Sequence, residues 1–203
     1  ISKAAWQSAG VPFTDHTEYL KAELRPKNIQ MLLGAPAKRL WTVTTTRHIP
    51  LRAVPNALSV KSVVAAATAL RDGLKLLGIR NPRIALSGLN PHAGEQGILG
   101  SEEKRVLIPA ARAAKIAGPI PADTAWRHHI AGHYDGLVCL YHDQALIGLK
   151  SAADLGIVNW TIGLPFPRTS PGHGTGFDIA GKRKPDPTGT IDAALLTARL
   201  ART

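Results

Sequence analysis

The chain has 203 residues, of which 44% are hydrophobic and 19% are charged, so it can bury a core and is not expected to be disordered. Its single cysteine, Cys139, excludes a disulfide framework and favours a reducing cytoplasm. The net charge of +11 suits nucleic acid or phosphorylated small molecules, but the basic residues are scattered, so nucleic acid is not the expected partner. No stretch reaches the roughly 18 apolar residues of a membrane span, and the N-terminus has no signal-peptide pattern, so no membrane association is expected.

The predicted elements alternate between helix and strand. In chain order, the patterns predict a helix over 2–9, a helix starting at Asp15 with Glu18 in a capping box, strands over 29–33 and 40–45, a helix over 59–77, a strand over 83–89, a helix over 101–117, strands over 135–141 and 156–164, and a helix over 190–200.

Three of these segments carry further expectations. Apolar residues repeat at i, i+3, i+4 and i+7 over 59–77, and Gly78 ends that helix. Pro109 is expected to kink the helix over 101–117. The Pro- and Gly-rich stretch 165–187 is predicted to be irregular. The alternation as a whole indicates an α/β layer fold with a mainly parallel or mixed sheet.

Three histidines each follow a predicted strand: His48, His92 and His142. Ligand sites in open α/β sheets lie beyond the carboxyl ends of the strands, so these side chains are candidates for one shared site. Three neutral imidazoles with an open position make a metal site that polarises a substrate oxygen. A single loop histidine is more often a hydrogen-bonding surface residue, and the spacing forms no local metal motif, so both interpretations stand.

Other polar residues also have two interpretations each. The three histidines within 128–133 cluster in a polar segment that we interpret as solvated helix surface. Lys150 either snorkels at a helix end or holds an anionic substrate. Asn159 interrupts an apolar strand, so backbone or a ligand must satisfy its amide. Arg168 is suited to fork onto a phosphate or carboxylate.

The segment 173–181 holds three glycines around a histidine and an aspartate. It is not the Gly-x-Gly-x-x-Gly fingerprint of dinucleotide-binding folds. Glycines permit a close approach of the backbone to a ligand, and a plain surface turn is the alternative.

Taken together, these segments resemble the 4-hydroxythreonine-4-phosphate dehydrogenase family of vitamin B6 biosynthesis. The matching stretches follow the expected order along nearly the whole chain: 13–18, 48–51, 88–95, 121–124, 141–150 and 163–181. The resemblance implies the three-layer α/β/α fold of isocitrate and isopropylmalate dehydrogenases, with the N-terminal part of the first domain absent from this chain. It implies a middle domain over 12–160 that binds metal and forms the dimer, while 1–11 and 161–203 belong to the first domain with its cofactor loop.

The resemblance also implies roles for individual residues. The metal ligands would be His48, His92 and His142, in a site completed across a homodimer interface. The catalytic candidates are Lys150 and Asp123. The substrate contacts would be His16, Thr17, Lys150, Asn159 and Arg168, and the cofactor loop would use His173, Gly174, Thr175, Asp178 and Ile179.

The reaction that the resemblance implies is oxidation of 4-phosphooxy-L-threonine by NAD, followed by decarboxylation, with zinc, magnesium or cobalt as the divalent metal. A close alternative is a related dehydrogenase that acts on a phosphorylated sugar acid or a dihydrodiol carboxylate. Two alternatives come from other functional classes: a basic binding module for nucleic acid, and a catalytically silent fragment that retains the metal.

Overall fold

The computed structural model describes residues 2–13, 16–153 and 155–202. Within them, seven strands form one sheet: β1 (Gln30–Ala35), β2 (Leu40–Thr44), β3 (Ile84–Ser87), β4 (Ala117–Ile120), β5 (Gly136–Cys139), β6 (Val158–Ile162) and β7 (Arg168–Pro171). The strands lie in the order β4-β3-β5-β2-β1-β6-β7. The first four of these are parallel, whereas β1 is antiparallel to both of its neighbours and β7 is antiparallel to β6. The carboxyl ends of β2, β3, β4 and β5 therefore share one edge of the sheet.

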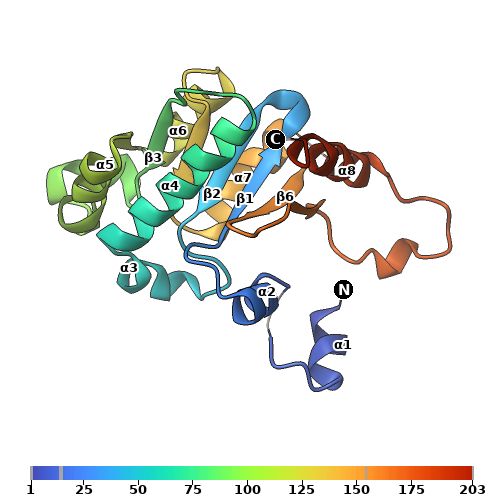
Figure 1. The fold of residues 1–203 in the computed structure, drawn as a ribbon. Helices are drawn as coiled ribbons and strands as arrows, with labels where there is room; N and C mark the ends of the chain where they lie inside the picture. Colours follow the sequence, from blue (N-terminus) through green and yellow to red (C-terminus); the bar gives the residue numbers. More distant parts are fainter. Residues whose placement is uncertain (1, 14–15, 154, 203) are drawn as a thin grey trace.

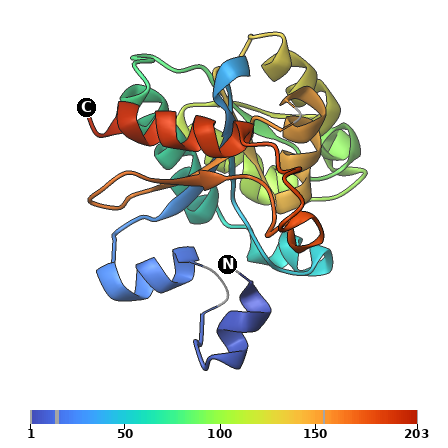
Figure 2. The same cartoon turned by 90° about the vertical axis from the view of Figure 1, so that its right-hand side faces the viewer.

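Helices cover both faces of this sheet (Figures 1 and 2). The helices of the described chain are α1 (Lys3–Ser8), α2 (His16–Leu24), α3 (Val54–Ala57), α4 (Val60–Leu76), α5 (Ile108–Ala114), α6 (Ala122–Ile130), α7 (His142–Ala153) and α8 (Thr188–Leu200), with short turns η1 (Pro36–Lys38), η2 (Leu51–Ala53), η3 (Pro91–Gly97), η4 (Glu103–Leu107) and η5 (Phe177–Ile179); α1 and α2 lie away from the sheet. One core cluster joins α4, α5 and α8 to the first face, and another joins α6 and α7 to the second. This arrangement confirms the predicted three-layer α/β/α fold.

The central helix α4 forms where the apolar stripe predicted it. The Ser59 side chain accepts from the backbone N–H of Ser62, and the Ser62 hydroxyl accepts from that of Ser59, which closes a capping box. Val63, Leu70 and Leu74 are fully buried against the sheet. The stripe therefore determined both the position and the buried face of this helix.

The predicted helix over 101–117 forms over 102–114, where a π-helical stretch, η4, runs directly into α5. Pro109, the residue expected to disturb the helix, lies just after this π-helical stretch, and only the C-terminal end of the prediction is wrong. The segment from Ala117 is strand β4, which pairs with β3. The stretch 165–187 also contains a strand, β7, whose Arg168 and Ser170 lie opposite Thr161 and Asn159 of β6. Neither short strand has an alternating pattern; both form because a neighbouring strand offers its free edge.

Two further expectations concern the N-terminal part and the domains. The predicted capping residue Asp15 lies outside the described residues, and α2 begins at His16. Strand β6 crosses residue 160, and the one sheet includes strands from both proposed domains, so the division at 160 stays a prediction. No single helix among the described residues is long and apolar enough to cross a membrane; the segments 51–57 and 60–76 reach that length only together, across a 96° bend.

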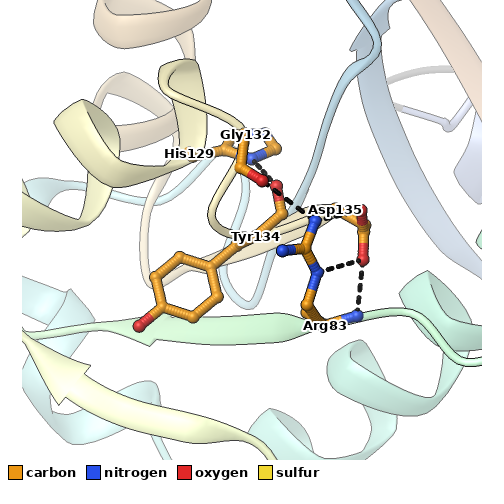
Figure 3. A network of polar contacts seen from close by, with 5 residues as sticks. All are labelled: Arg83, His129, Gly132, Tyr134 and Asp135. Carbon is orange, nitrogen blue, oxygen red and sulfur yellow. Dashed lines mark hydrogen bonds and ion pairs between the residues drawn. The ribbon is translucent and has the colours of Figure 1, made fainter.

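The interpretation of the histidines within 128–133 as solvated surface is wrong for His129, which is 1% exposed. Its Nε2 accepts a hydrogen bond from the backbone N–H of Trp41, and its Nδ1–H donates to the carbonyl of Tyr134 (Figure 3). The neutral ring thus joins α6 to the start of β2. Burial lowers the pKa of His129 below its ordinary value.

Beside this ring, hydrogen bonds between Arg83 and Asp135 join the amino ends of β3 and β5 (Figure 3). The Arg83 backbone N–H and guanidinium both donate to the Asp135 carboxylate, at 2.7 to 3.1 Å, and the guanidinium also donates to the carbonyl of Gly132. Partial burial acts to raise the pKa of Asp135, but the hydrogen bonds from Arg83 outweigh it and hold that pKa below its ordinary range.

Protonation of His129 is expected to make stability depend on pH below neutrality. Because the folded pKa of His129 is lowered, the unfolded chain takes up its proton first as the pH falls through 6.5. The free energy of unfolding should then fall as the pH drops below about 6.5, by up to about 1.4 kcal/mol per pH unit. The carboxyl groups of Glu102, Asp135 and Asp186 also have lowered pKa values. Their stabilising contributions are lost only as the pH falls below their ordinary pKa values, 4.5 for Glu102 and 3.8 for the two aspartates.

Urea unfolding at several pH values measures this slope. His129→Gln should flatten it, because a glutamine does not titrate, while the same change at exposed His133 should leave it as it is. An equal slope in the wild type and the His129→Gln variant would assign the pH dependence to other groups.

Candidate active site

The structure brings together two of the three predicted metal ligands, His48 and His142. Each follows one of the neighbouring parallel strands β2 and β5, and their ring centroids lie 5.8 Å apart. That distance is close to the spacing of about 4.8 Å between adjacent strands, so the sheet itself places the two rings side by side. They flank a shallow hollow of about 230 Å³, whose other lining residues are Arg47, Ile49, Leu51, Val54, Tyr141 and Asp143.

The His142 ring is held by its neighbour. Its Nδ1 lies 2.7 Å from the Asp143 carboxylate, and both side chains are partly open to solvent. A carboxylate that accepts from Nδ1–H fixes the tautomer and leaves Nε2 as the electron-pair donor. The pair thus has the arrangement of a metal-binding histidine with its supporting acid.

His92 lies at the same edge, on the exposed turn η3 that follows β3. Because β3 is the other neighbour of β5, this turn begins beside the strand that leads to His142. Nevertheless, no three His, Cys, Asp or Glu side chains in the described ranges lie close enough together to hold a metal ion. One copy of the chain therefore assembles two of the predicted ligands and leaves the third apart.

Sequence reasoning missed a group of buried polar atoms at the end of β2. Thr44 Oγ1, Thr45 Oγ1 and Arg47 Nη1 are buried and have no hydrogen-bond partner among the described residues. Leaving such atoms unpaired costs free energy. Of the three residues, Arg47 lines the hollow of His48 and His142, so its Nη1 indicates a place where a polar ligand binds in that hollow. The signal in the sequence was the polar run 44–47, which ends an otherwise apolar strand.

The predicted substrate contacts His16 and Thr17 lie in the first turn of α2. The next residue, Glu18, pairs with Arg47 at 3.4 Å between Oε1 and Nη2, and Arg47 precedes His48. Thr17 is buried, and the His16 ring lies 4.8 Å from the ring of Trp6. The ion pair thus brings the start of α2 to the hollow of His48 and His142.

Asn159 and Arg168 lie on the same face of the sheet, which α7 covers in part. The Asn159 amide nitrogen donates to Met31 Sδ at 3.1 Å, whereas its Oδ1 is buried and unpaired within the described structure. Arg168 donates to Thr161 Oγ1 at 2.8 Å. Residues 159 and 161 alternate with Trp160, which packs on the opposite face, so the three polar side chains share one surface.

The two predicted catalytic residues lie on different helices. Lys150 is exposed near the end of α7, about 12 Å along the helix axis from His142 at a rise of about 1.5 Å per residue. Asp123 is exposed in the first turn of α6, which follows β4, two strands away from β5.

The predicted cofactor loop follows β7 and projects away from the sheet before α8 (Figure 1). The His173 Nδ1 lies 2.9 Å from the carbonyl oxygen of Gly174, and His173, Thr175 and Asp178 are exposed. Ile179 ends the short turn η5, which begins after Gly176 in the left-handed region. The described structure does not bring this loop to His48 and His142.

Comparisons with known proteins agree with this architecture. A family model described as pyridoxal phosphate biosynthetic protein PdxA matches residues 1–197. A 4-hydroxythreonine-4-phosphate dehydrogenase of Bradyrhizobium diazoefficiens is 44% identical over 212 residues, which cover 99% of this chain and 61% of the relative.

Two crystal structures share the fold. A 4-hydroxythreonine-4-phosphate dehydrogenase from Klebsiella pneumoniae has a TM-score of 0.83 and 35% identity, covering 98% of this chain and 62% of that one. A terephthalate 1,2-cis-dihydrodioldehydrogenase from Burkholderia xenovorans has a TM-score of 0.75 and 30% identity, covering 98% and 64%.

The chain thus spans 61 to 64% of the length of these three proteins. The family model matches all but the last six of its 203 residues. The chain therefore belongs to the family of the pyridoxal phosphate biosynthetic protein PdxA.

Proposed function

We propose that this protein is an NAD- and divalent-metal-dependent dehydrogenase of vitamin B6 biosynthesis, which oxidises 4-phosphooxy-L-threonine to a β-keto acid that then loses carbon dioxide. The observation that carries the proposal is the pairing of His48 and His142 in a hollow also lined by Arg47, whose buried Nη1 has no partner among the described residues, in a chain of this family. The single buried thiol of Cys139 supports a reducing cytoplasm as the location.

The donor set suits zinc or cobalt, because neutral imidazole nitrogens are good ligands for both, and magnesium is the remaining candidate. His48, His92 and His142 would hold the ion, and a divalent cation at such a site supplies polarisation of a substrate oxygen. Since His92 stands apart from the other two rings in one chain, the proposal places the complete site in a homodimer. Two exposed apolar residues fit such an interface: Leu51, which lines the hollow and is 66% exposed, and Ile98, which follows the turn of His92 and is 80% exposed.

The other side chains would bind and orient the substrate. Arg168 and Lys150 carry positive charge suited to the phosphate and carboxylate groups, together with His16 and Thr17 at the start of α2. Asn159 Oδ1, which has no donor among the described residues, is free to accept from a substrate hydroxyl or amino group. Lys150 or Asp123 would accept the proton, and Asp123 would reach the site from the second copy.

The loop with His173, Gly174, Thr175, Asp178 and Ile179 would bind NAD. Its exposure and its glycines leave the backbone accessible to a dinucleotide. Hydride transfer is the chemistry of the nicotinamide, so the protein has to supply orientation and exclude water.

A second candidate is a dehydrogenase for dihydrodiol carboxylates. The specific observation in its favour is the likeness to the terephthalate 1,2-cis-dihydrodioldehydrogenase, at 30% identity over nearly the whole chain. Both substrates present a hydroxyl beside an anionic group, so the histidines would bind either one. The groups around Arg168 would instead distinguish the phosphate ester from the dihydrodiol.

An assay of NADH formation tests the proposal. The purified chain, stripped with a chelator, is given zinc, cobalt or magnesium and then NAD with 4-phosphooxy-L-threonine, a phosphorylated sugar acid or the dihydrodiol of terephthalate. We expect NADH with the first substrate alone, and only after metal is restored. Arg168→Met should raise its KM about 10–100-fold, because a charged hydrogen bond is worth about 1.5–3 kcal/mol.

Other outcomes contradict the proposal in different ways. NADH from the dihydrodiol alone would support the second candidate. Metal binding without NADH from any substrate would indicate a catalytically silent chain. Salt-dependent binding of nucleic acid without bound metal would favour a basic binding module.

A further inference from the structure

The turn that carries His92 has an unusual backbone. Five successive residues, 92–96, have φ between 41° and 77° and ψ between 0° and 62°, which is the left-handed helical region. Only Gly94 is suited to it, because in the other four a Cβ crowds the following carbonyl oxygen. We call residues 92–96 the left-handed turn. A run of L-residues in this conformation needs support from outside itself.

That support comes from one buried carboxylate. Glu103, in η4, is 2% exposed. Its Oε1 accepts from the backbone N–H groups of Leu89 and Asn90 at 2.9 and 2.8 Å, and its Oε2 accepts from the Asn90 side-chain amide at 2.9 Å. Three donors thus converge on one side chain at the point where the chain enters the turn.

Glu103 also packs against the middle of the turn. A Cβ on Gly94 would lie 2.7 Å from Glu103 Oε2, so glycine is required there both by its φ of +77° and by the approach of the carboxylate. The remaining bonds are local: the N–H groups of Ala93, Ile98 and Leu99 donate to carbonyls three or five residues earlier. Local bonds of this kind do not orient the turn relative to the sheet.

The segment that leads into the left-handed turn is hydrogen-bonded to the start of α7. Gln144, in the first turn of α7, donates through Nε2 to the carbonyl of Gly88 at 2.8 Å, and Gly88 donates to the carbonyl of Ile120 in β4. The start of the turn and the start of α7 are therefore fixed to each other. Glu103, which binds the backbone of Leu89 and Asn90, sets the direction of the chain after Gly88.

We infer that Glu103 is a positioning residue, whose carboxylate holds the left-handed turn in shape so that His92 is presented at the carboxyl edge of the sheet. The inference rests on the proposed function in one respect, that His92 is a metal ligand. The charge matters as well as the shape: a glutamine would turn an N–H₂ toward either the backbone donors or the Asn90 amide, so one contact would become donor against donor. Glu103→Gln is therefore the informative substitution.

The matched control is Glu102→Gln. Glu102 is the adjacent acid and also accepts from the Asn90 side chain, at 2.9 Å, but it bonds neither backbone N–H. Amide hydrogen exchange of the metal-free chain reads the turn directly. In Glu103→Gln we expect exchange at Asn90, Ala93 and Leu99 to be about 10–100-fold faster, with Val138 in β5 unchanged, and we expect the Glu102 variant to resemble the wild type.

Two further measurements separate positioning from general destabilisation. Affinity for Co²⁺, added alone as the probe, should fall about 10–100-fold in Glu103→Gln, as for other residues that orient a metal ligand. Adding Gln96→Gly, which removes a Cβ from an exposed position with φ of 56°, should restore several-fold of both losses.

The outcomes are distinguishable. Unchanged exchange at the turn in Glu103→Gln would overturn the inference, whatever the metal does. Faster exchange with unchanged Co²⁺ affinity would show that the turn does not present His92, and would overturn it too. A wild-type chain that binds no Co²⁺ would contradict the proposed function, while the exchange data would still decide whether Glu103 holds the turn.

Discussion

Replacing His142 by alanine is expected to lower the affinity of this protein for Co²⁺ or Zn²⁺ by about 100–1000-fold. Four-ligand zinc sites are worth about 10–16 kcal/mol, so each ligand contributes about 2.5–4 kcal/mol. His142 stands between the other candidates, because β5 lies between β2 and β3 in the sheet. Its loss would also remove the imidazole that Asp143 orients. No other substitution is expected to affect metal binding more.

Competition with a coloured chelator measures this affinity. The matched control is His133→Ala, which removes an exposed histidine whose ring lies 5.0 Å from that of His128, outside the hollow. We expect the control to bind metal like the wild type. An equal loss in both variants, or no loss in His142→Ala, would mean that the bound ion sits on surface imidazoles and not between His48 and His142.

Gln144→Leu is expected to cause the largest loss of stability, about 2–6 kcal/mol. The buried side chain accepts from the backbone N–H of Leu140 at 2.7 Å and donates to the carbonyl of Gly88 at 2.8 Å. Leucine has a similar size but bonds neither group, and each buried backbone group left unsatisfied costs about 1–3 kcal/mol. The segments that follow β5 and β3, at Leu140 and Gly88, would lose the side chain that joins them.

Urea unfolding with and without the substitution checks this value. Ile147→Gln lies on the same helix with its side chain 69% exposed, and it should change stability by less than about 0.5 kcal/mol. A loss below about 1 kcal/mol in Gln144→Leu would show that water or a small backbone shift satisfies both groups.

The sequence alone was sufficient for elements whose pattern is local. The stripe over 59–77 predicted α4, the β-branched run over 40–45 predicted β2, and the segment 190–200 predicted most of α8. These succeed because a helix or strand that buries one face repeats its apolar residues at its own period. The same local information placed His48, His92 and His142 after strands, and the resemblance of whole motifs identified the family.

What the sequence did not contain was the lateral order of the strands and the partners of buried polar groups. Strands β4 and β7 carry no alternation and exist because β3 and β6 pair with them. The buried His129 accepts a hydrogen bond from Trp41, which lies 88 residues away in the chain. The carboxylate of Glu103, in η4, accepts hydrogen bonds from the backbone of Leu89 and Asn90.

The candidate site shows the same division. Local patterns put each histidine at a strand end, but only the order β3-β5-β2 makes His48 and His142 neighbours, and only the left-handed turn sets His92 apart from them. Strand order and turn orientation depend on contacts between residues far apart in the chain, and no local period encodes such contacts.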